Sequence, residues 1–260
     1  MFTGMTDLGL RLTVDGPVAR VVLDRPEVRN AQTPAMWRAL AEFGTALPAE
    51  VRVVVVSGEG PSFSAGLDRK LIMGEAVAGE EPLLSLGAKP AVEVHETIAG
   101  FQAGFSWLRR PEIVSIAAVQ GHAVGAGFQL ALACDLRVVT PDAKFSMREP
   151  ALGLVPDLGG TQPLVQLVGY SRALEICATS RWVEADEARQ LGLANIVVPA
   201  AELAGTVKDL SEALLTPLAG AVRETKALLL GAVDRSYGEQ LKAEREAQTR
   251  RLSELLAAFG

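Results

Sequence analysis

The 260-residue chain has the composition of a globular protein that can bury a full core, with 49% hydrophobic and 22% charged residues. Its formal net charge of −6 argues against nucleic acid as a partner, and no apolar run reaches the ~18 residues of a membrane span. The N-terminal region lacks the basic start and long apolar middle of a signal peptide. We therefore expect a cytoplasmic protein without membrane contact.

The rarest residue types argue against several kinds of site. Cys134 and Cys177 lie in helix-like patterns, which favours buried free thiols over a disulfide. His95 and His122 are the only histidines and have no neighbours at metal-ligand spacing, so we expect no metal site. The G-x-S-x-G motif occurs nowhere in the chain, which leaves a catalytic Ser–His–Asp triad without support.

The first elements in the chain are a hairpin and a capped helix. Residues 12–14 and 18–23 flank Asp15-Gly16, a good hairpin signal. Residues 25–31 predict a loop. Thr33 and Pro34 then supply the cap and the first-turn proline of a helix that we expect to end near Leu47.

Two apolar segments, 51–57 and 113–119, predict buried strands that each end in a glycine-rich turn, and the second turn leads into a helix at about 128–134. Neither turn has the glycine spacing of a dinucleotide-binding loop. A tight turn and a helix N-terminus direct unpaired backbone N–H groups at one point. If the strands are sheet neighbours, two such groups could hold one oxygen as an oxyanion hole. The alternative is that the glycines only allow tight turns.

The segment between these strands contains no recognisable motif. Residues 73–90 are small, acidic and poorly periodic, and predict a mobile loop. Residues 91–108 predict a helix that carries Phe101, Phe105 and Trp107. We favour a core role for these aromatics, with a ligand pocket as the alternative.

The remainder of the chain is predicted to be mainly helical. A strand at 136–139 comes first, and after Pro163 only a short strand at 195–198 interrupts the helices. A boundary near Pro199 separates a last section, 203–259, of long amphipathic helices with Pro217 as a helix start.

Five segments together resemble the crotonase (enoyl-CoA hydratase/isomerase) superfamily. They are F-S-A-G-L-D at 63–68, G-H-A-V-G-A-G at 121–127, C-D-L-R at 134–137, the 153–161 loop, and W-V-E-A-D-E-A-R-Q-L-G-L at 182–193. The resemblance implies an α/β fold: a crotonase-like spiral of ββα units with an acyl-CoA site at 1–199, and a C-terminal helical trimerisation region at 200–260. It also implies an acyl-CoA thioester as partner, assembly as a homotrimer or dimer of trimers, and no cofactor apart from the coenzyme A of the substrate.

The same resemblance implies roles for individual residues. The backbone N–H groups of Leu67 and Ala126 would form a thioester oxyanion hole. Glu149 would be the acid/base, and Asp157 matches a third acid position seen in dienoyl-CoA isomerases. The positions expected to contact coenzyme A are Arg25, Arg29, Ala65, Asp68, Arg69 and Lys70.

The acid–base residues decide the expected reaction. Typical hydratases use two glutamates, and here the first of the two positions is Gln129 while the second is Glu149. Losing one general acid or base costs about 10²–10⁴ in rate, so we expect enoyl-CoA isomerisation, which needs one carboxylate, more than efficient hydration. The alternatives are a hydratase that uses Glu149 with Gln129 orienting the water, and a non-catalytic acyl-CoA-binding protein. Residues 73–90 and 91–108 would line the acyl end.

Overall fold

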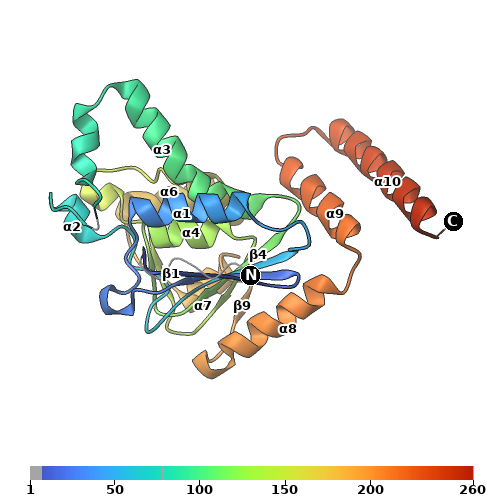
Figure 1. Cartoon of the computed structure of the whole chain (residues 1–260), viewed down its shortest axis with the longest axis horizontal. Coiled ribbons are helices and arrows are strands. Elements are labelled where there is room, and N and C mark those ends of the chain that lie inside the picture. The colour runs from blue at the N-terminus through green and yellow to red at the C-terminus, as the bar shows by residue number, and fades with distance from the viewer. Residues whose placement is uncertain (1–7, 78, 260) are drawn as a thin grey trace.

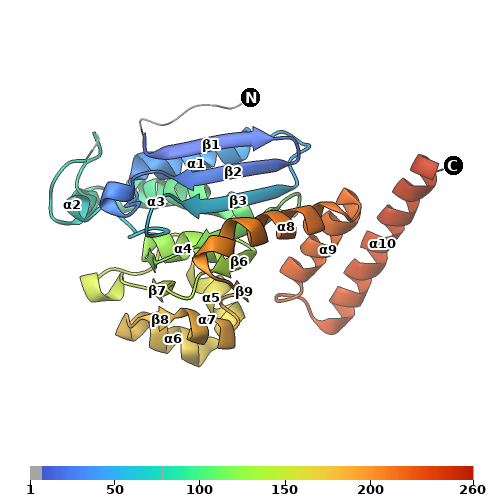
Figure 2. The same cartoon turned by 90° about the horizontal axis from the view of Figure 1, so that it is seen from below.

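The computed structural model describes residues 8–77 and 79–259. A six-stranded sheet in the order β1-β2-β3-β4-β6-β9 forms its centre, and a small sheet in the order β5-β7-β8 lies beside it. Helices cover both faces of the central sheet, and two further helices project from one end (Figures 1 and 2). The expected α/β class is confirmed.

The central sheet consists of an antiparallel hairpin followed by parallel strands. Its strands are β1 (Leu10–Asp15), β2 (Val18–Leu23), β3 (Val53–Gly58), β4 (Val114–Val119), β6 (Leu136–Val139) and β9 (Ile196–Val197). β3 and β4 pair directly, with Val53 opposite Val114 and Ser57 opposite Ala118. The carboxyl ends of these two strands therefore open on the same sheet edge, as the two-turn hypothesis required.

Side-chain alternation along β3 and β4 divides the core into two clusters, one on each face of the sheet. Val54, Val56, Ala117 and Val119 belong to the larger cluster, under α1 (Pro34–Thr45), α3 (Ala91–Ser106) and α4 (Ala126–Ala133). Val53, Val55, Ile116 and Ala118 face the smaller cluster, which α8 (Leu203–Leu215) covers with Leu203, Val207, Leu210 and Leu214. Figure 2 shows α8 lying across the strands.

The predicted hairpin is present, and so is the capped helix. The Thr33 hydroxyl accepts a hydrogen bond from the Met36 N–H at 3.4 Å, and α1 ends at Thr45, two residues before the expected Leu47. Helix α3 is also present, and its continuation η4 (Trp107–Arg109) completes the predicted 91–108 segment. Phe101, Phe105 and Trp107 are buried in the larger core cluster, which confirms their core role, and Phe101 also lines a cavity, as the alternative proposed.

Several short elements were missed by the sequence analysis. The expected 73–90 loop begins after α2 (Arg69–Ile72) and contains the 3₁₀ helix η3 (Leu83–Ala88). The second glycine-rich turn contains β5 (His122–Val124), which pairs with β7 (Lys144–Ser146). β8 (Val183–Glu184) pairs with β7 within the region expected to be helical. Each is two to six residues long, and the strands are defined by partners far along the chain, which local patterns do not reveal.

The last 60 residues differ in how closely they join the core. α8 is part of the core, whereas α9 (Ala219–Gly231) and α10 (Tyr237–Phe259) extend away from it as a helical pair (Figure 1). The Lys226 ammonium anchors α9, because it donates to the Ile113 carbonyl and to Asp135, both at 2.7 Å. Pro217 lies two residues before α9 instead of in its first turn. The boundary near Pro199 stays a prediction.

The remaining helices are η2 (Pro26–Val28), η5 (Pro150–Leu152), α5 (Thr161–Val168), α6 (Tyr170–Thr179), α7 (Ala185–Gln190) and η6 (Ala200–Glu202). Within the described ranges, no helix combines the length and the hydropathy that a membrane crossing requires.

Candidate active site

The two glycine-rich turns pack against each other so closely that no side chain fits between them. Gly66 has φ +86°, and a Cβ there would lie 2.4 Å from the Val124 carbonyl oxygen. A Cβ on Gly127 would lie 2.7 Å from the Ser64 side chain. Backbone hydrogen bonds between Ser64 and the β5 residues His122 and Val124, at 2.8 and 3.0 Å, join the turns. Glycine is therefore needed at these positions for close approach as well as for turning.

Each turn leaves one backbone N–H unpaired where they meet. The groups on either side of Leu67 bond to Gln32: the Gln32 N–H donates to the Gly66 carbonyl at 2.7 Å, and the Asp68 N–H donates to the Gln32 carbonyl at 2.8 Å. The Leu67 N–H thus faces away from Gln32, and Ala126 is the first residue of α4. Neither N–H has an acceptor among the described residues. Two unpaired donors at one place can hold a developing negative oxygen.

Glu149 lies beside this pair of donors. A Cβ on Gly125, the residue before Ala126, would be 3.2 Å from Glu149 Oε1. Hydrogen bonds from the N–H groups of Leu152 and Leu154, both 2.9 Å, fix the Glu149 carbonyl and thereby its backbone. Burial raises the pKa of Glu149, with a hydrogen bond from Gln129 acting in the opposite direction. The Oε2 atom is buried and has no partner within the described part of the chain, so it is free to take a proton.

Gln129 binds Glu149 from the side that faces away from the cavity. Its Oε1 accepts from the N–H groups of Leu158 and Gly160 at 2.9 and 3.3 Å, which directs its amide N–H toward Glu149 Oε1 at 2.7 Å. The side chain is fully buried, and it is not one of the described residues that line the cavity. Gln129 is therefore placed to orient Glu149, and its contacts leave it poorly placed to hold a substrate water.

A cavity of ≈ 830 Å³ opens in front of these groups. Leu67, Ala126, Glu149 and Asp157 all line it, so the structure brings four of the five predicted oxyanion and acid–base residues together. Burial raises the pKa of Asp157, and the Asp157 carbonyl accepts a hydrogen bond from the Gln102 side chain at 2.7 Å. A carboxyl group with a raised pKa in the same cavity as the candidate base could act as a second proton carrier.

The positions expected to contact coenzyme A do not all share one environment. Arg25 and Asp68 form an ion pair at 3.1 Å, and Arg25 also donates to the Ala31 carbonyl at 2.7 Å, so both side chains have structural partners. Ala65 and Arg69 line the cavity.

Arg29 and Lys70 are exposed outside it, and the Arg29 carbonyl accepts from the Ala65 N–H at 2.8 Å. The Arg29 backbone is thus next to Ala65, and Arg69 lines the same cavity two residues after Leu67, at its thioester end.

Arg148 is a cavity residue that the sequence analysis did not identify. Its guanidinium lies 4.8 Å from the centre of the Trp182 ring, a cation–π contact, and Trp182 in turn meets the His122 ring edge-on at 5.6 Å. Arg148 precedes Glu149, so this stack supports the backbone that carries the candidate base. Because Arg148 and Trp182 are distant in sequence, no local pattern connects them.

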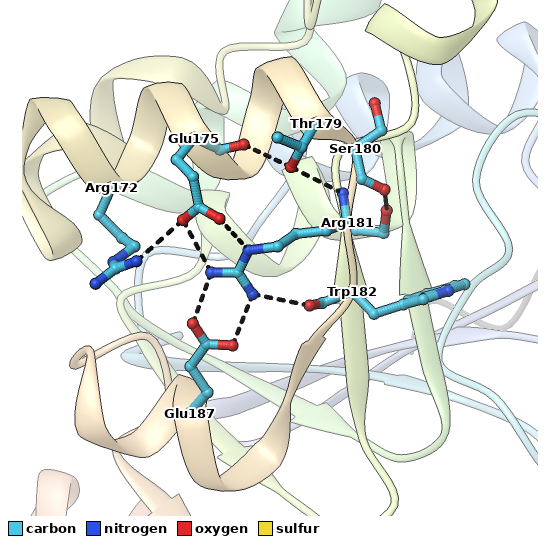
Figure 3. Close-up of polar contacts among 8 residues, drawn as sticks. Arg172, Glu175, Thr179, Ser180, Arg181, Trp182 and Glu187 are labelled. Atoms are coloured by element: carbon cyan, nitrogen blue, oxygen red, sulfur yellow. Dashed lines mark hydrogen bonds and ion pairs between the residues drawn. The ribbon is translucent and has the colours of Figure 1, made fainter.

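An ion-pair cluster fixes the segment that carries Trp182 (Figure 3). Arg181 binds Glu175 of α6 and Glu187 of α7, each through two hydrogen bonds. These bonds lower the pKa of Glu175 to about 2, lower the pKa of Glu187 and raise the pKa of Arg181. Glu175, Arg181 and Glu187 are therefore all charged at neutral pH, and their ion pairs join α6, α7 and the 180–182 segment.

The same segment also supports the oxyanion turn. The buried Ser146 hydroxyl donates to the Ser180 carbonyl at 2.9 Å, and the Ser146 carbonyl accepts from the Gly125 N–H at 2.9 Å. Residues 180–182 thus contact the supports of both Glu149 and Ala126 without lining the cavity themselves.

The described residues give little support for a metal site or for a cysteine nucleophile. Within residues 8–77 and 79–259 there is no cluster of three or more His, Cys, Asp or Glu side chains that could hold a metal ion. Both cysteines are free thiols: Cys134 is buried, as predicted, whereas Cys177 is only partly buried. Burial raises the pKa of Cys134 to about 12, which makes that thiol a poor nucleophile.

Comparisons with known proteins agree with this geometry. A family model described as enoyl-CoA hydratase/isomerase matches residues 13–256. A Thermobifida fusca protein provisionally named an enoyl-CoA hydratase, solved in complex with CoA, is 51% identical over 97% of this chain and 96% of its own, with a TM-score of 0.92. Its complex with acetoacetyl-CoA is 52% identical over 96% of each chain, also with a TM-score of 0.92.

Two named relatives represent two reactions. The human mitochondrial Delta(3,5)-Delta(2,4)-dienoyl-CoA isomerase is 34% identical over 231 residues, 86% of this chain and 69% of the relative. The short-chain-enoyl-CoA hydratase of Clostridium acetobutylicum is 31% identical over 247 residues, 91% of this chain and 86% of the relative. The crotonase fold is confirmed by the structural matches, and the chain belongs to the enoyl-CoA hydratase/isomerase family of the crotonase superfamily.

Proposed function

We propose that this protein isomerises the double bond of an enoyl-CoA through a thioester enolate. The Leu67 and Ala126 N–H groups hold the thioester oxygen, and Glu149 moves the proton. The observation that carries the proposal is the Gln129–Glu149 hydrogen bond of 2.7 Å, which leaves one carboxylate oxygen, Oε2, bare beside the two unpaired donors. A single base in this position suits a proton shift, whereas efficient hydration would use two carboxylates.

The proton steps balance without any further group. Glu149 Oε2 takes a proton from C2 of a 3-enoyl thioester, and the electron pair forms the enolate whose oxygen the two N–H groups hold. The electrons then return, the double bond moves to C2–C3, and Glu149 delivers its proton to C4. Each well-placed donor stabilises such an oxyanion by about 3–4 kcal/mol. Since burial raises the Glu149 pKa, its carboxylate is a stronger base than an exposed one. The proposal therefore includes no resident cofactor.

Coenzyme A enters as part of the substrate in this proposal. The Thermobifida fusca protein, 51–52% identical, has been solved with CoA and with acetoacetyl-CoA, which supports thioester binding here. We assign the nucleotide end to the exposed basic side chains Arg29, Arg69 and Lys70, next to Ala65. Arg25 and Asp68, which are bound to each other, shape that side of the cavity.

The direct test compares two reactions in one enzyme preparation. A 3-enoyl-CoA should be converted to its conjugated 2-enoyl isomer at least about 100-fold faster than crotonyl-CoA is hydrated, the low end of what a missing acid or base costs. With a 3-enoyl-CoA that carries deuterium at C2, deuterium should appear at C4 of the product. Hydration at the isomerisation rate would favour the hydratase alternative. Thioester binding without either reaction would favour the non-catalytic alternative.

A dienoyl-CoA isomerase is a second candidate, favoured by Asp157. This carboxyl group lines the same cavity as Glu149 and has a raised pKa, and one named relative catalyses that reaction class by name. Moving a proton from C2 to C6 of a dienoyl thioester covers a longer path than a C2-to-C4 shift, and a second acid would serve its far end. Asp157→Asn should then stop dienoyl isomerisation while largely sparing the mono-enoyl reaction.

We also propose a trimer, or a dimer of trimers, formed through the projecting helices. Large apolar side chains on α9, on α10 and between them are exposed in the single chain. Monomeric proteins rarely expose so many large apolar side chains in one region, so they indicate an interface. They are Leu229, Val233, Tyr237, Leu252 and Leu256. Light scattering should give a multiple of three of the 27.4 kDa chain mass, and a monomer at micromolar concentration would contradict the assembly.

A further inference from the structure

The part of the cavity beyond Glu149 is walled by aliphatic side chains. They come from three elements: Leu83, Leu84 and Leu86 of η3, Val94 and Ile98 of α3, and Leu152, Leu154 and Val155 from η5 and the loop that follows it. Among the described residues that line the cavity there is no Ser, Thr, Asn, Gln, Tyr or His. The nearby Trp37 N–H is already used, because it donates to the Gln32 side chain at 2.7 Å.

The charged groups of the cavity are in place for other tasks. Glu149 and Asp157 face the reacting carbons in the proposed function, and Arg69 lies next to the turn that carries Leu67. The Arg148 guanidinium stacks on Trp182, which is not a lining residue. The distal wall consequently offers no polar partner that would select a hydroxylated or charged acyl group.

Apolar side chains continue onto the rim of the cavity. Met73, Leu84, Leu152 and Val155 all line it and are nevertheless more than half exposed. Several large apolar residues exposed around one opening mark a binding surface. The rim belongs to the α2–η3–α3 side of the molecule, at the opposite end from α9 and α10, so these helices of the same chain do not cover it (Figures 1 and 2).

The size of the cavity bears on the length of the acyl chain. A methylene group takes up about the same ~30 Å³ as a water molecule, so a four-carbon acyl group fills only about 120 Å³ and a ten-carbon group about 300 Å³. A cavity of ≈ 830 Å³ must also admit the pantetheine arm, yet a four-carbon group would leave most of the aliphatic wall uncovered.

We propose that the substrate carries an apolar acyl chain of medium length, roughly eight to twelve carbons. The chain passes Glu149 and lies along η3 and the 152–155 segment, with its end against the apolar rim. This inference rests on the proposed function for the position of the thioester. It concerns the acyl group alone and holds for either isomerase candidate.

The binding test uses saturated acyl-CoAs, which have no double bond to react. Burying one methylene should tighten binding up to about fourfold, so decanoyl-CoA should bind at least about 100-fold more tightly than butyryl-CoA. Calorimetry with the four-, six-, eight-, ten- and twelve-carbon thioesters measures the series. A preference for the four-carbon thioester would overturn the chain-length proposal while leaving the isomerase proposal standing. A chain-length preference without any isomerisation would do the reverse.

A matched pair of variants locates the chain on η3. Leu84 lines the cavity and is 65% exposed, whereas Val92 of α3 is 64% exposed and is not a lining residue. Because both side chains are largely in solvent, Leu84→Asp and Val92→Asp should both fold. Leu84→Asp should lower the ratio of decanoyl-CoA to butyryl-CoA affinity at least about fivefold, and Val92→Asp should leave that ratio unchanged. Equal ratios in both variants, or a changed oligomeric mass for Leu84→Asp without a changed ratio, would overturn the placement.

Discussion

The two ends of the cavity are built from different materials. At the thioester end, backbone atoms of Leu67 and Ala126 provide the donors, and glycines pack them together at the ends of two paired strands. At the acyl end, side chains form the wall on η3 and on the 152–155 segment. The segment that leads into η3 is joined to α1 by the Arg38–Glu80 ion pair, and η3 itself is a helix that is not part of either sheet. A backbone site demands particular backbone conformations, whereas an aliphatic wall demands only size and hydrophobicity.

This difference leads us to expect unequal sensitivity to substitution. Changes at the thioester end should reduce turnover by orders of magnitude and leave chain-length preference alone. Changes at the acyl end should alter preference and leave the chemistry alone. The following variants test the thioester side of that contrast.

The largest effect is expected for Glu149→Gln, which removes the base and preserves shape. Turnover should fall by about 10²–10⁴ while thioester affinity changes less than about threefold. Since burial raises the pKa of Glu149, the parent rate should fall as pH drops through that raised pKa, and this acid limb should be absent from the residual rate. Steady-state kinetics across pH measures both. Glu184→Gln, an exposed glutamate on β8, is the control. Near-parental turnover in Glu149→Gln would transfer the base role to Asp157.

Gly66→Ala should have the next largest effect, because it disturbs one oxyanion donor. Its Cβ would lie 2.4 Å from the Val124 carbonyl oxygen, so the turn that carries the Leu67 N–H must move. Losing one such donor costs about 10²–10³ in kcat. Gly74→Ala is a matched control on the acyl side, since Gly74 also has positive φ, +91°, but nothing lies within 4 Å of its Cβ position. Similar kinetic losses in both variants would attribute the effect to backbone strain.

Gln129→Glu probes the residue that holds the base. The new carboxyl group would face Glu149 Oε1, where a hydrogen bond of 2.7 Å now runs, and two close carboxylates raise the pKa of the pair. Isomerisation at neutral pH should fall about tenfold and recover as pH rises, because more of the pair then ionises. Gln129→Ala, which removes the hydrogen bond without adding charge, should not show that recovery. A tenfold gain in crotonyl-CoA hydration by Gln129→Glu would instead show that this side chain reaches a substrate water.

Sequence patterns predicted the thioester end better than the acyl end, because a backbone site requires particular residues at particular spacings and an aliphatic wall does not. Glycine-rich turns after apolar strands leave a mark in the sequence, and β3 and β4 begin and end within two residues of their predicted bounds. The Gln129–Glu149 contact could not be derived locally, because it depends on the 158–160 loop that orients the amide. Local patterns do not predict η3, because a hydrophobic wall of leucines has no required spacing. The Arg148–Trp182 stack joins two segments that only the small sheet brings together.

The smallest effect is expected from the Arg181 cluster, which touches neither end of the cavity. Arg181→Ala releases Glu187 and leaves Glu175 with Arg172 as its partner. It thereby loosens the 180–182 segment, which supports Arg148 through Trp182 and Gly125 through Ser146. Turnover should fall roughly threefold to tenfold, well below the 10²-fold cost of a 1 Å misplacement, with little change in KM. Arg172→Ala is the control, because Arg172 contacts Glu175 alone and lies outside the 180–182 segment.

The cluster also has a predicted pH signature. Its hydrogen bonds lower the Glu175 pKa from 4.5 to about 2, so their contribution to stability is complete above pH 4.5 and is lost as pH falls toward 2. The melting temperature of Arg181→Ala should lie a few degrees below the parent at pH 7, since exposed ion pairs contribute little, and the two should converge between pH 4.5 and 2. Lower stability together with unchanged kcat would make the cluster a clamp for α6 and α7 alone. In that case the geometry of Glu149 is set by Gln129 and by the backbone hydrogen bonds from Leu152 and Leu154, without a contribution from the Arg181 cluster.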